Sequence, residues 1–110
     1  LTLPAAPPRA HRPGSVGCAI IGLGDYALRQ IMPRFAQSER AHIAALVSGN
    51  PAKLRAVGEA YGVPPEARYS YDSFAEIAAN PAVEAVYIVL PTGLHAAWAE
   101  RAFAAGKHVM

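Results

Sequence analysis

Cysteine is almost absent from this sequence of 110 residues, and long apolar runs and a strong net charge are absent too. The single Cys18 excludes an internal disulfide and a thiolate metal cluster, and its apolar neighbours predict a buried side chain. No apolar run approaches the roughly 20 residues that a membrane-spanning helix needs. The formal net charge of +2 comes from scattered residues, so we predict neither nucleic acid nor a membrane surface as a partner.

Groupings of catalytic or metal-binding side chains are also missing. The four histidines have no companions at ligand spacing, so the sequence predicts no metal site. It contains no Ser-His-Asp or Cys-His arrangement that would indicate nucleophilic catalysis. The sequence is 53% hydrophobic, which is enough for one domain with an apolar core.

Proline is concentrated near the N-terminus, where residues 1–15 contain Pro4, Pro7, Pro8 and Pro13. Because proline removes backbone donors and favours extended geometry, we predict an N-terminal arm over residues 1–15. The arm is either a disordered tail or a segment that packs on a neighbouring subunit. Residues 16–110 are predicted to form one nucleotide-binding domain.

Short apolar runs alternate with helical spacing along residues 16–110. We predict strands at Val16–Ile21, Ile43–Val47, Arg68–Tyr71, Ala85–Leu90 and Lys107–Met110, and helices at Tyr26–Phe35, Ala52–Tyr61, Ser73–Ala79 and Leu94–Ala105. Pro33 is expected to tighten or end the first helix, Asn50 to cap the second and Asp72 to cap the third. This alternation predicts an α/β fold, a Rossmann-type doubly wound parallel sheet whose fifth strand begins where the sequence ends.

A glycine-rich turn follows the first strand and opens the first helix. Gly22 and Gly24 let the backbone turn tightly and approach a ligand, and the small Ala27 lets the helix pack close to its strand. The unpaired N–H groups of the helix N-terminus attract a pyrophosphate. Glycine pairs also occur in ordinary turns, so the surrounding strand–helix–strand pattern is what favours a dinucleotide here.

The end of the second strand indicates which dinucleotide is bound. NAD-selective sites place an acidic residue about 20 positions after the turn, and here Ser48 stands 21 residues after Ala27. The Ser48 hydroxyl, the amides of Gly49 and Asn50 and the Lys53 ammonium would favour a 2′-phosphate, which a carboxylate would repel. We therefore predict NADP as the cofactor. The alternative is a plain polar turn with a helix cap, followed by a solvated Lys53.

The end of the fourth strand, Leu90-Pro91-Thr92-Gly93-Leu94-His95, is expected to lie against the nicotinamide and its ribose. Pro91 would make the turn rigid and give a ring an apolar wall. His95 either lines a substrate pocket or caps its own helix. Tyr69, Tyr71 and Tyr87 are most simply explained as core or strand-face residues.

Four stretches together resemble the N-terminal domain of the Gfo/Idh/MocA oxidoreductase family, and within it the glucose–fructose oxidoreductase type. They are Gly22–Leu28, Ala45–Asn50, Ala85–Pro91 with His95, and Ala104–Met110. The resemblance implies a tightly held NADP(H) that carries hydride to or from the carbon of a sugar or polyol. It assigns pyrophosphate contacts to Gly22, Leu23, Gly24, Tyr26 and Ala27, 2′-phosphate contacts to Ser48, Gly49, Asn50 and Lys53, and the nicotinamide side to Leu90, Pro91, Thr92 and His95. Thr92 departs from the asparagine that is common in the family.

The same resemblance implies that the catalytic part lies beyond this sequence. In the family a Glu-Lys-Pro motif, whose lysine is catalytic, follows the stretch that matches Gly106–Met110, and a substrate domain comes after it. No catalytic residue is therefore predicted here. The expected function is the NADP(H)-binding domain of an oxidoreductase, periplasmic or cytoplasmic, with a sugar substrate and homo-oligomers only in the full-length form. The alternatives are a non-catalytic nucleotide-binding or regulatory module and a Rossmann domain for another nucleotide.

Overall fold

A computed structural model describes residues 14–110, so the predicted arm lies outside the described residues except for Gly14 and Ser15. The strands are β1 (Val16–Ile21), β2 (Ala41–Val47), β3 (Arg68–Tyr69), β4 (Ala85–Ile88) and β5 (His108–Val109). The α-helices are α1 (Met32–Gln37), α2 (Pro51–Tyr61) and α3 (His95–Ala104). A π-helical turn, η1 (Ala27–Ile31), precedes α1, and 3₁₀ turns occur at η2 (Pro65–Ala67), η3 (Phe74–Ala79) and η4 (Thr92–Leu94). None of the helices described is long and apolar enough to cross a membrane.

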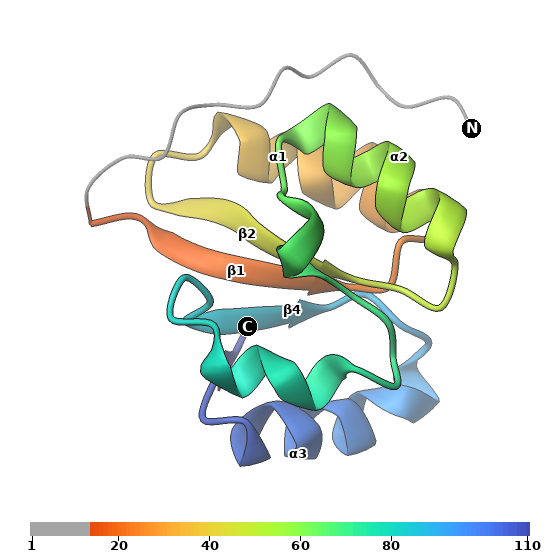
Figure 1. Ribbon diagram of the computed structural model, residues 1–110, viewed down its shortest axis with the longest axis vertical. Coiled ribbons are helices and arrows are strands. Elements are labelled where there is room, and N and C mark those ends of the chain that lie inside the picture. The colour runs from red at the N-terminus through yellow and green to blue at the C-terminus, as the bar shows by residue number, and fades with distance from the viewer. Residues whose placement is uncertain (1–13) are drawn as a thin grey trace.

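The five strands form one parallel sheet in the order β3-β2-β1-β4-β5 (Figure 1). The chain builds outward from β1 to β3, and then crosses back to add β4 and β5 on the other side of β1. This reversal at β1 creates the crevice at which doubly wound sheets bind ligands. Ile21 pairs with Val47 on one side and with Ile88 on the other, so β1, β2 and β4 end level with one another.

Helices cover both faces of the sheet, with α1 and α2 on one face and η3 and α3 on the other (Figure 1). The sheet is therefore the middle of three layers. All of β1 after Val16 is buried, because the strand packs against helices on both sides. The predicted α/β Rossmann-type fold is confirmed, and Cys18 is fully buried as expected.

The first helix differs from its prediction because Pro33 does not end it. The helical region continues to Gln37, with Pro33 in the first turn of α1. Proline has no N–H, and its ring collides with the carbonyl four residues earlier in a regular helix. The chain instead makes a wider π turn before the proline, in which the Met32 N–H bonds to the Ala27 carbonyl.

The segment around the third strand also differs. The strand ends at Tyr69, and 3₁₀ structure over 74–79 replaces the predicted helix. Asp72 does not cap this segment. The Ser73 Oγ accepts from the Ser70 N–H at 3.0 Å and the Ser70 Oγ accepts from the Ser73 N–H at 3.1 Å, so two serine hydroxyls bind the turn's backbone donors instead.

The second helix has the ends that its sequence predicts. The Asn50 Oδ1 accepts the Lys53 N–H at 3.2 Å, and Pro51 starts the first turn. Gly62 ends the helix in the left-handed region with a φ of 68°. These ends fix α2 directly after β2, at the same sheet edge as the glycine turn.

Candidate functional site

A cleft of about 360 Å³ opens at the carboxyl ends of β1, β2 and β4. It lies where the strand order reverses, as expected of a ligand site in this fold. Its lining consists of Gly22, Leu23, Gly24, Ser48, Gly49, Asn50, Lys53, Tyr71, Val89, Leu90 and Pro91. The cleft therefore brings together residues from all three strand ends that the sequence singled out.

The turn after β1 needs glycine at its first position for two reasons. Gly22 has a φ of 95°, which L-residues rarely adopt, and a β-carbon there would lie 2.5 Å from the Val89 carbonyl oxygen. Gly24 is different, because a β-carbon there would meet no protein atom within 4 Å. The space beside Gly24 is therefore open for a ligand, and the helical region begins immediately after it with a bond from the Leu28 N–H to the Gly24 carbonyl.

The turn after β2 is both a capped helix start and a wall of the cleft. The Ser48 N–H bonds to the Tyr69 carbonyl, and the Ser48 Oγ accepts the Asn50 N–H at 3.1 Å. The Asn50 amide is thus engaged inside the turn. The Ser48 hydroxyl keeps its own proton to donate into the cleft. The cap and the ligand site are therefore compatible in one turn.

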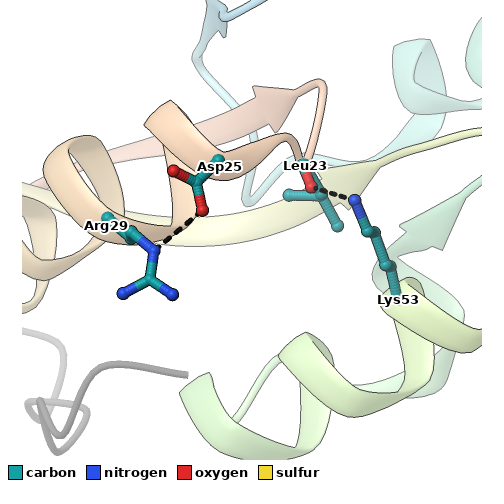
Figure 2. A network of polar contacts seen from close by, with 4 residues as sticks. All are labelled: Leu23, Asp25, Arg29 and Lys53. Atoms are coloured by element: carbon teal, nitrogen blue, oxygen red, sulfur yellow. Dashed lines mark hydrogen bonds and ion pairs between the residues drawn. The ribbon is translucent and has the colours of Figure 1, made fainter. Parts of the chain in front are cut away.

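Lys53 reaches from α2 across to the glycine turn (Figure 2). Its Nζ donates to the Leu23 carbonyl oxygen at 3.0 Å. Among the lining residues, all of which lie within 14–110, Lys53 carries the one charged side chain. Asp25, also drawn in Figure 2, is outside the lining and is paired with Arg29 at 2.8 Å. The cleft is therefore cationic at the end of β2.

Four predicted contacts do not line the cleft. Tyr26 is 62% exposed, and Ala27 is fully buried beneath the turn. Thr92 is exposed in η4. His95 does not cap α3, because its Nε2 lies 2.7 Å from the Leu90 carbonyl oxygen, to which it donates. His95 therefore fixes the backbone of the Leu90 turn rather than facing the cleft.

Two lining residues, Tyr71 and Val89, were missed by the sequence analysis. Tyr71 was expected in the core or on a strand face, and it does pack against the apolar core; its ring also lies against Gly49, where a β-carbon would be 3.0 Å from the ring. Tyr71 comes two residues after β3, so its position past a parallel strand end was a signal for the same sheet edge. Val89 follows β4 in the same way.

Residues 14–110 contain no group of three or more histidine, cysteine, aspartate or glutamate side chains that could hold a metal ion. The chemistry of the cleft is therefore set by backbone amides, a serine hydroxyl, a lysine and apolar walls. That combination suits an elongated ligand with a phosphate at one end and a flat ring at the other.

A family model described as "GFO_IDH_MocA: Oxidoreductase family, NAD-binding Rossmann fold" matches residues 16–110. The chain belongs to this family. It is 44% identical over 102 residues to a dTDP-3,4-didehydro-2,6-dideoxy-α-D-glucose 3-reductase of Streptomyces violaceoruber, covering 93% of this chain and 27% of the relative. Among solved structures, an aldose–aldose oxidoreductase from Caulobacter crescentus is 55% identical with a TM-score of 0.85, covering 87% of this chain and 29% of the other.

Solved relatives have been seen with both forms of the cofactor. A 3-ketoreductase from Actinomadura kijaniata in complex with NADP is 31% identical with a TM-score of 0.75, covering 87% of this chain and 29% of the other. A scyllo-inositol dehydrogenase from Lactobacillus casei with bound NAD(H) is 32% identical with a TM-score of 0.69, covering 86% and 27%. The chain spans just over a quarter of the length of these relatives. It is an NAD(P)-binding domain of this oxidoreductase family, and several of its relatives are sugar or polyol oxidoreductases.

Proposed function

We propose that this chain is the NADP(H)-binding domain of an oxidoreductase that transfers hydride to or from a carbon of a sugar or polyol. The observation that carries the proposal is the electrostatics of the cleft at the end of β2. Lys53 brings a positive charge there, and the lining residues, all within 14–110, include no carboxylate. A 2′-phosphate is the group that distinguishes NADP from NAD and that this charge would stabilise.

The hydrogen-bond partner of Lys53 also supports NADP over NAD. The ammonium donates to a neutral carbonyl, that of Leu23, so its charge is not balanced by a carboxylate of the cleft. A phosphate dianion would supply that balance. Ser48 adds a hydroxyl donor at the position where an acidic residue would favour the 2′-hydroxyl of NAD.

The remaining contacts follow from the order of the three strand ends. The pyrophosphate would lie at Gly22, Leu23 and Gly24, beside the opening of the helical region. The nicotinamide side would border Leu90 and Pro91, with His95 holding that turn through the Leu90 carbonyl. Ala27 would act through close packing of the turn, and Tyr26 and Thr92 remain predicted contacts. The cofactor supplies the hydride, and this chain binds and orients it.

The proposed substrate class comes from the relatives, which include an aldose–aldose oxidoreductase and a scyllo-inositol dehydrogenase. The substrate itself would meet the nicotinamide next to Leu90 and Pro91. No catalytic residue is assigned within this chain.

Titration of the purified protein with NADPH and NADH, followed through energy transfer from Trp98, tests the cofactor. We expect tighter binding of NADPH. Lys53→Met should weaken NADPH binding about tenfold or more and leave NADH nearly unchanged, because a charge-assisted bond is worth about 1.5–3 kcal/mol. Ser48→Asp should reverse the preference, since its carboxylate repels a 2′-phosphate and accepts from a 2′-hydroxyl.

Arg55→Met is the matched control for Lys53→Met. It removes the same charge from the same helix, but the Arg55 side chain is 80% exposed and lies 3.7 Å from Glu59. Its affinity for NADPH should stay within about twofold of the wild type. Equal or tighter binding of NADH by the wild-type protein would contradict the proposed cofactor.

A further inference from the structure

Arg101 lies in α3 and is not one of the residues that line the cleft. Its guanidinium nonetheless contacts three aromatic residues, Tyr71, Phe74 and Trp98, which we call the aromatic cluster. The Arg101 Nη2 donates to the Tyr71 carbonyl oxygen at 2.9 Å. The Arg101 Cζ lies 4.0 Å from the centre of the Trp98 ring and 5.2 Å from the centre of the Phe74 ring. A planar cation stacked on indole at this distance is favourable.

The aromatic cluster connects α3 to the cleft. The Tyr71 and Trp98 ring centres are 5.1 Å apart, and those of Phe74 and Trp98 are 5.2 Å apart. The Tyr71 ring also contacts the turn at Gly49, where even a β-carbon would press against it. The ring therefore touches both Trp98 and the turn that follows β2.

Tyr71 is partly buried against the apolar core, and few hydrogen bonds reach it. It lies between β3 and η3, outside any regular element. Within residues 14–110 the bond from Arg101 is the one hydrogen bond that Tyr71 makes. The hydroxyls of Ser70 and Ser73 hold the loop on either side of Tyr71, and Arg101, 30 positions later in the sequence, holds the Tyr71 carbonyl itself.

We propose that Arg101 is a positioning residue for the adenosine end of the cofactor cleft, acting through Tyr71. This inference rests on the proposed function and adds a specificity determinant to it. Arg101 holds the Tyr71 carbonyl and, by stacking on Trp98, the surface against which the Tyr71 ring packs. Tyr71 then forms a fixed wall of the cleft beside the turn at Gly49, so the adenosine 2′-phosphate half of the cofactor enters a preformed site.

A purely structural role would give different behaviour. If the aromatic cluster only packs η3 against α3, loss of Arg101 lowers the melting temperature but leaves the affinity of the folded protein unchanged. If Arg101 acts through Tyr71, loss of Arg101 weakens ligands of the adenosine end, and the loss disappears once Tyr71 is already removed.

The experiment is a double-mutant cycle between Arg101→Met and Tyr71→Leu, with affinities for NADPH and adenosine 2′,5′-bisphosphate measured by calorimetry. We expect Arg101→Met to weaken both ligands by about fivefold to tenfold, because one charge-assisted bond and one stacked cation are lost. In the Tyr71→Leu background the same change should alter affinity by less than about twofold. The Trp98 signal in near-ultraviolet circular dichroism should change in Arg101→Met without ligand.

Arg101→Lys and Arg34→Met are the control variants. A lysine keeps the charge but not the planar donor group, so its affinity should fall between those of the wild type and Arg101→Met. If Arg101→Met does not fold, Arg101→Lys carries the test with an expected loss of about twofold to threefold. Arg34→Met removes a charge from an exposed position in α1 and should bind like the wild type.

Each result separates this inference from the proposed function. A wild-type protein that binds neither ligand would overturn both. If the wild type binds but the Arg101 variants bind equally well, the inference fails and the proposed function stands. An undiminished effect of Arg101→Met in the Tyr71→Leu background would also overturn it, because Arg101 would then not act through Tyr71.

Discussion

The two edges of the same parallel sheet are built in opposite ways. At the amino edge, where the strands begin, side chains bond to the backbone and to one another. The Glu84 carboxylate accepts the Gly17 N–H at 3.1 Å, the Lys107 Nζ donates to the Asn80 carbonyl at 3.0 Å, and the Ser15 Oγ lies 3.0 Å from the His42 Nδ1.

At the carboxyl edge the strands end in turns that leave room between them. Gly24 has no neighbour where a β-carbon would be, and Lys53 donates to a neutral carbonyl. The polar groups of this edge also bond within the protein, but Ser48, Asn50 and Lys53 line a cleft as they do so. Stability and binding are therefore divided between opposite ends of the sheet. The reason is that a parallel sheet puts all its strand ends, and the helix N-termini that follow them, on one side.

The substitution with the largest expected effect on stability is Gly17→Ala, at the amino edge. In Gly17→Ala the new β-carbon would lie 1.9 Å from the Ala82 carbonyl oxygen, a backbone atom that cannot move aside alone. We expect the free energy of unfolding to fall by about 3 kcal/mol or more. Urea denaturation followed by circular dichroism measures it. A loss below about 1 kcal/mol would mean that this edge is less tightly closed than the structure indicates.

The next effect concerns Cys18, which lies in β1 near the amino edge. Its thiol lies 3.4 Å from the Met110 Sδ, and burial, with a smaller contribution from the Glu84 charge, raises the pKa of Cys18 to about 11. At pH 8 its thiolate is about 100-fold rarer than that of a free cysteine, so alkylation by iodoacetamide should be at least that much slower.

The pH dependence of the thiolate itself gives the sign. Because the folded thiol keeps its proton, the ultraviolet absorbance of the thiolate should rise in the folded protein around pH 11, not around pH 9. Glu84→Gln keeps an acceptor for the Gly17 N–H while removing the charge, and it should move this rise to lower pH. A rise centred near pH 9 in the folded protein would contradict the closed environment of the thiol.

The substitution with the smallest expected effect on stability is Gly24→Ala, at the carboxyl edge. Gly24→Ala adds a β-carbon where there is open space and no positive φ, so unfolding free energy should change by less than about 1 kcal/mol. The same methyl group intrudes on the proposed pyrophosphate position, and NADPH should bind about tenfold more weakly. Titration and denaturation of one protein preparation give both numbers. Unchanged affinity would place the pyrophosphate elsewhere.

Three elements show which parts of the fold could be predicted from the sequence and which could not. Asn50, Pro51 and Gly62 act on their own helix, so the bounds of α2 could be predicted from local chemistry. Pro33 was misjudged because a π turn, which no local pattern announces, absorbs its steric conflict. Asp72 was misjudged because the segment after it is a 3₁₀ turn that begins at Ser73, where the hydroxyls of Ser70 and Ser73 bond across the chain.

The residues of the candidate site also divide into those that the sequence predicted and those that it did not. The glycine turn, the Ser48 turn and the Leu90-Pro91 turn could be recognised, because each follows an apolar run directly. Tyr71 was not assigned to the site, because the predicted strand ran to Tyr71 and a tyrosine on a strand fits the core. The observed strand ends at Tyr69, and contacts with Gly49 and Trp98, which are remote in sequence, place the Tyr71 ring against both the core and the cleft.

By itself, the sequence determined the parallel α/β fold, the turns that end its strands and the polar character of the second turn. Periodicity, capping and glycine chemistry are local properties, and they suffice for these features. Only the tertiary structure decided that Lys53 bonds to the glycine turn, that His95 holds the Leu90 carbonyl and that Arg101 reaches Tyr71. Those contacts depend on how helices and loops pack on a twisted sheet. This packing alone decides which backbone atom of another element a long side chain can reach.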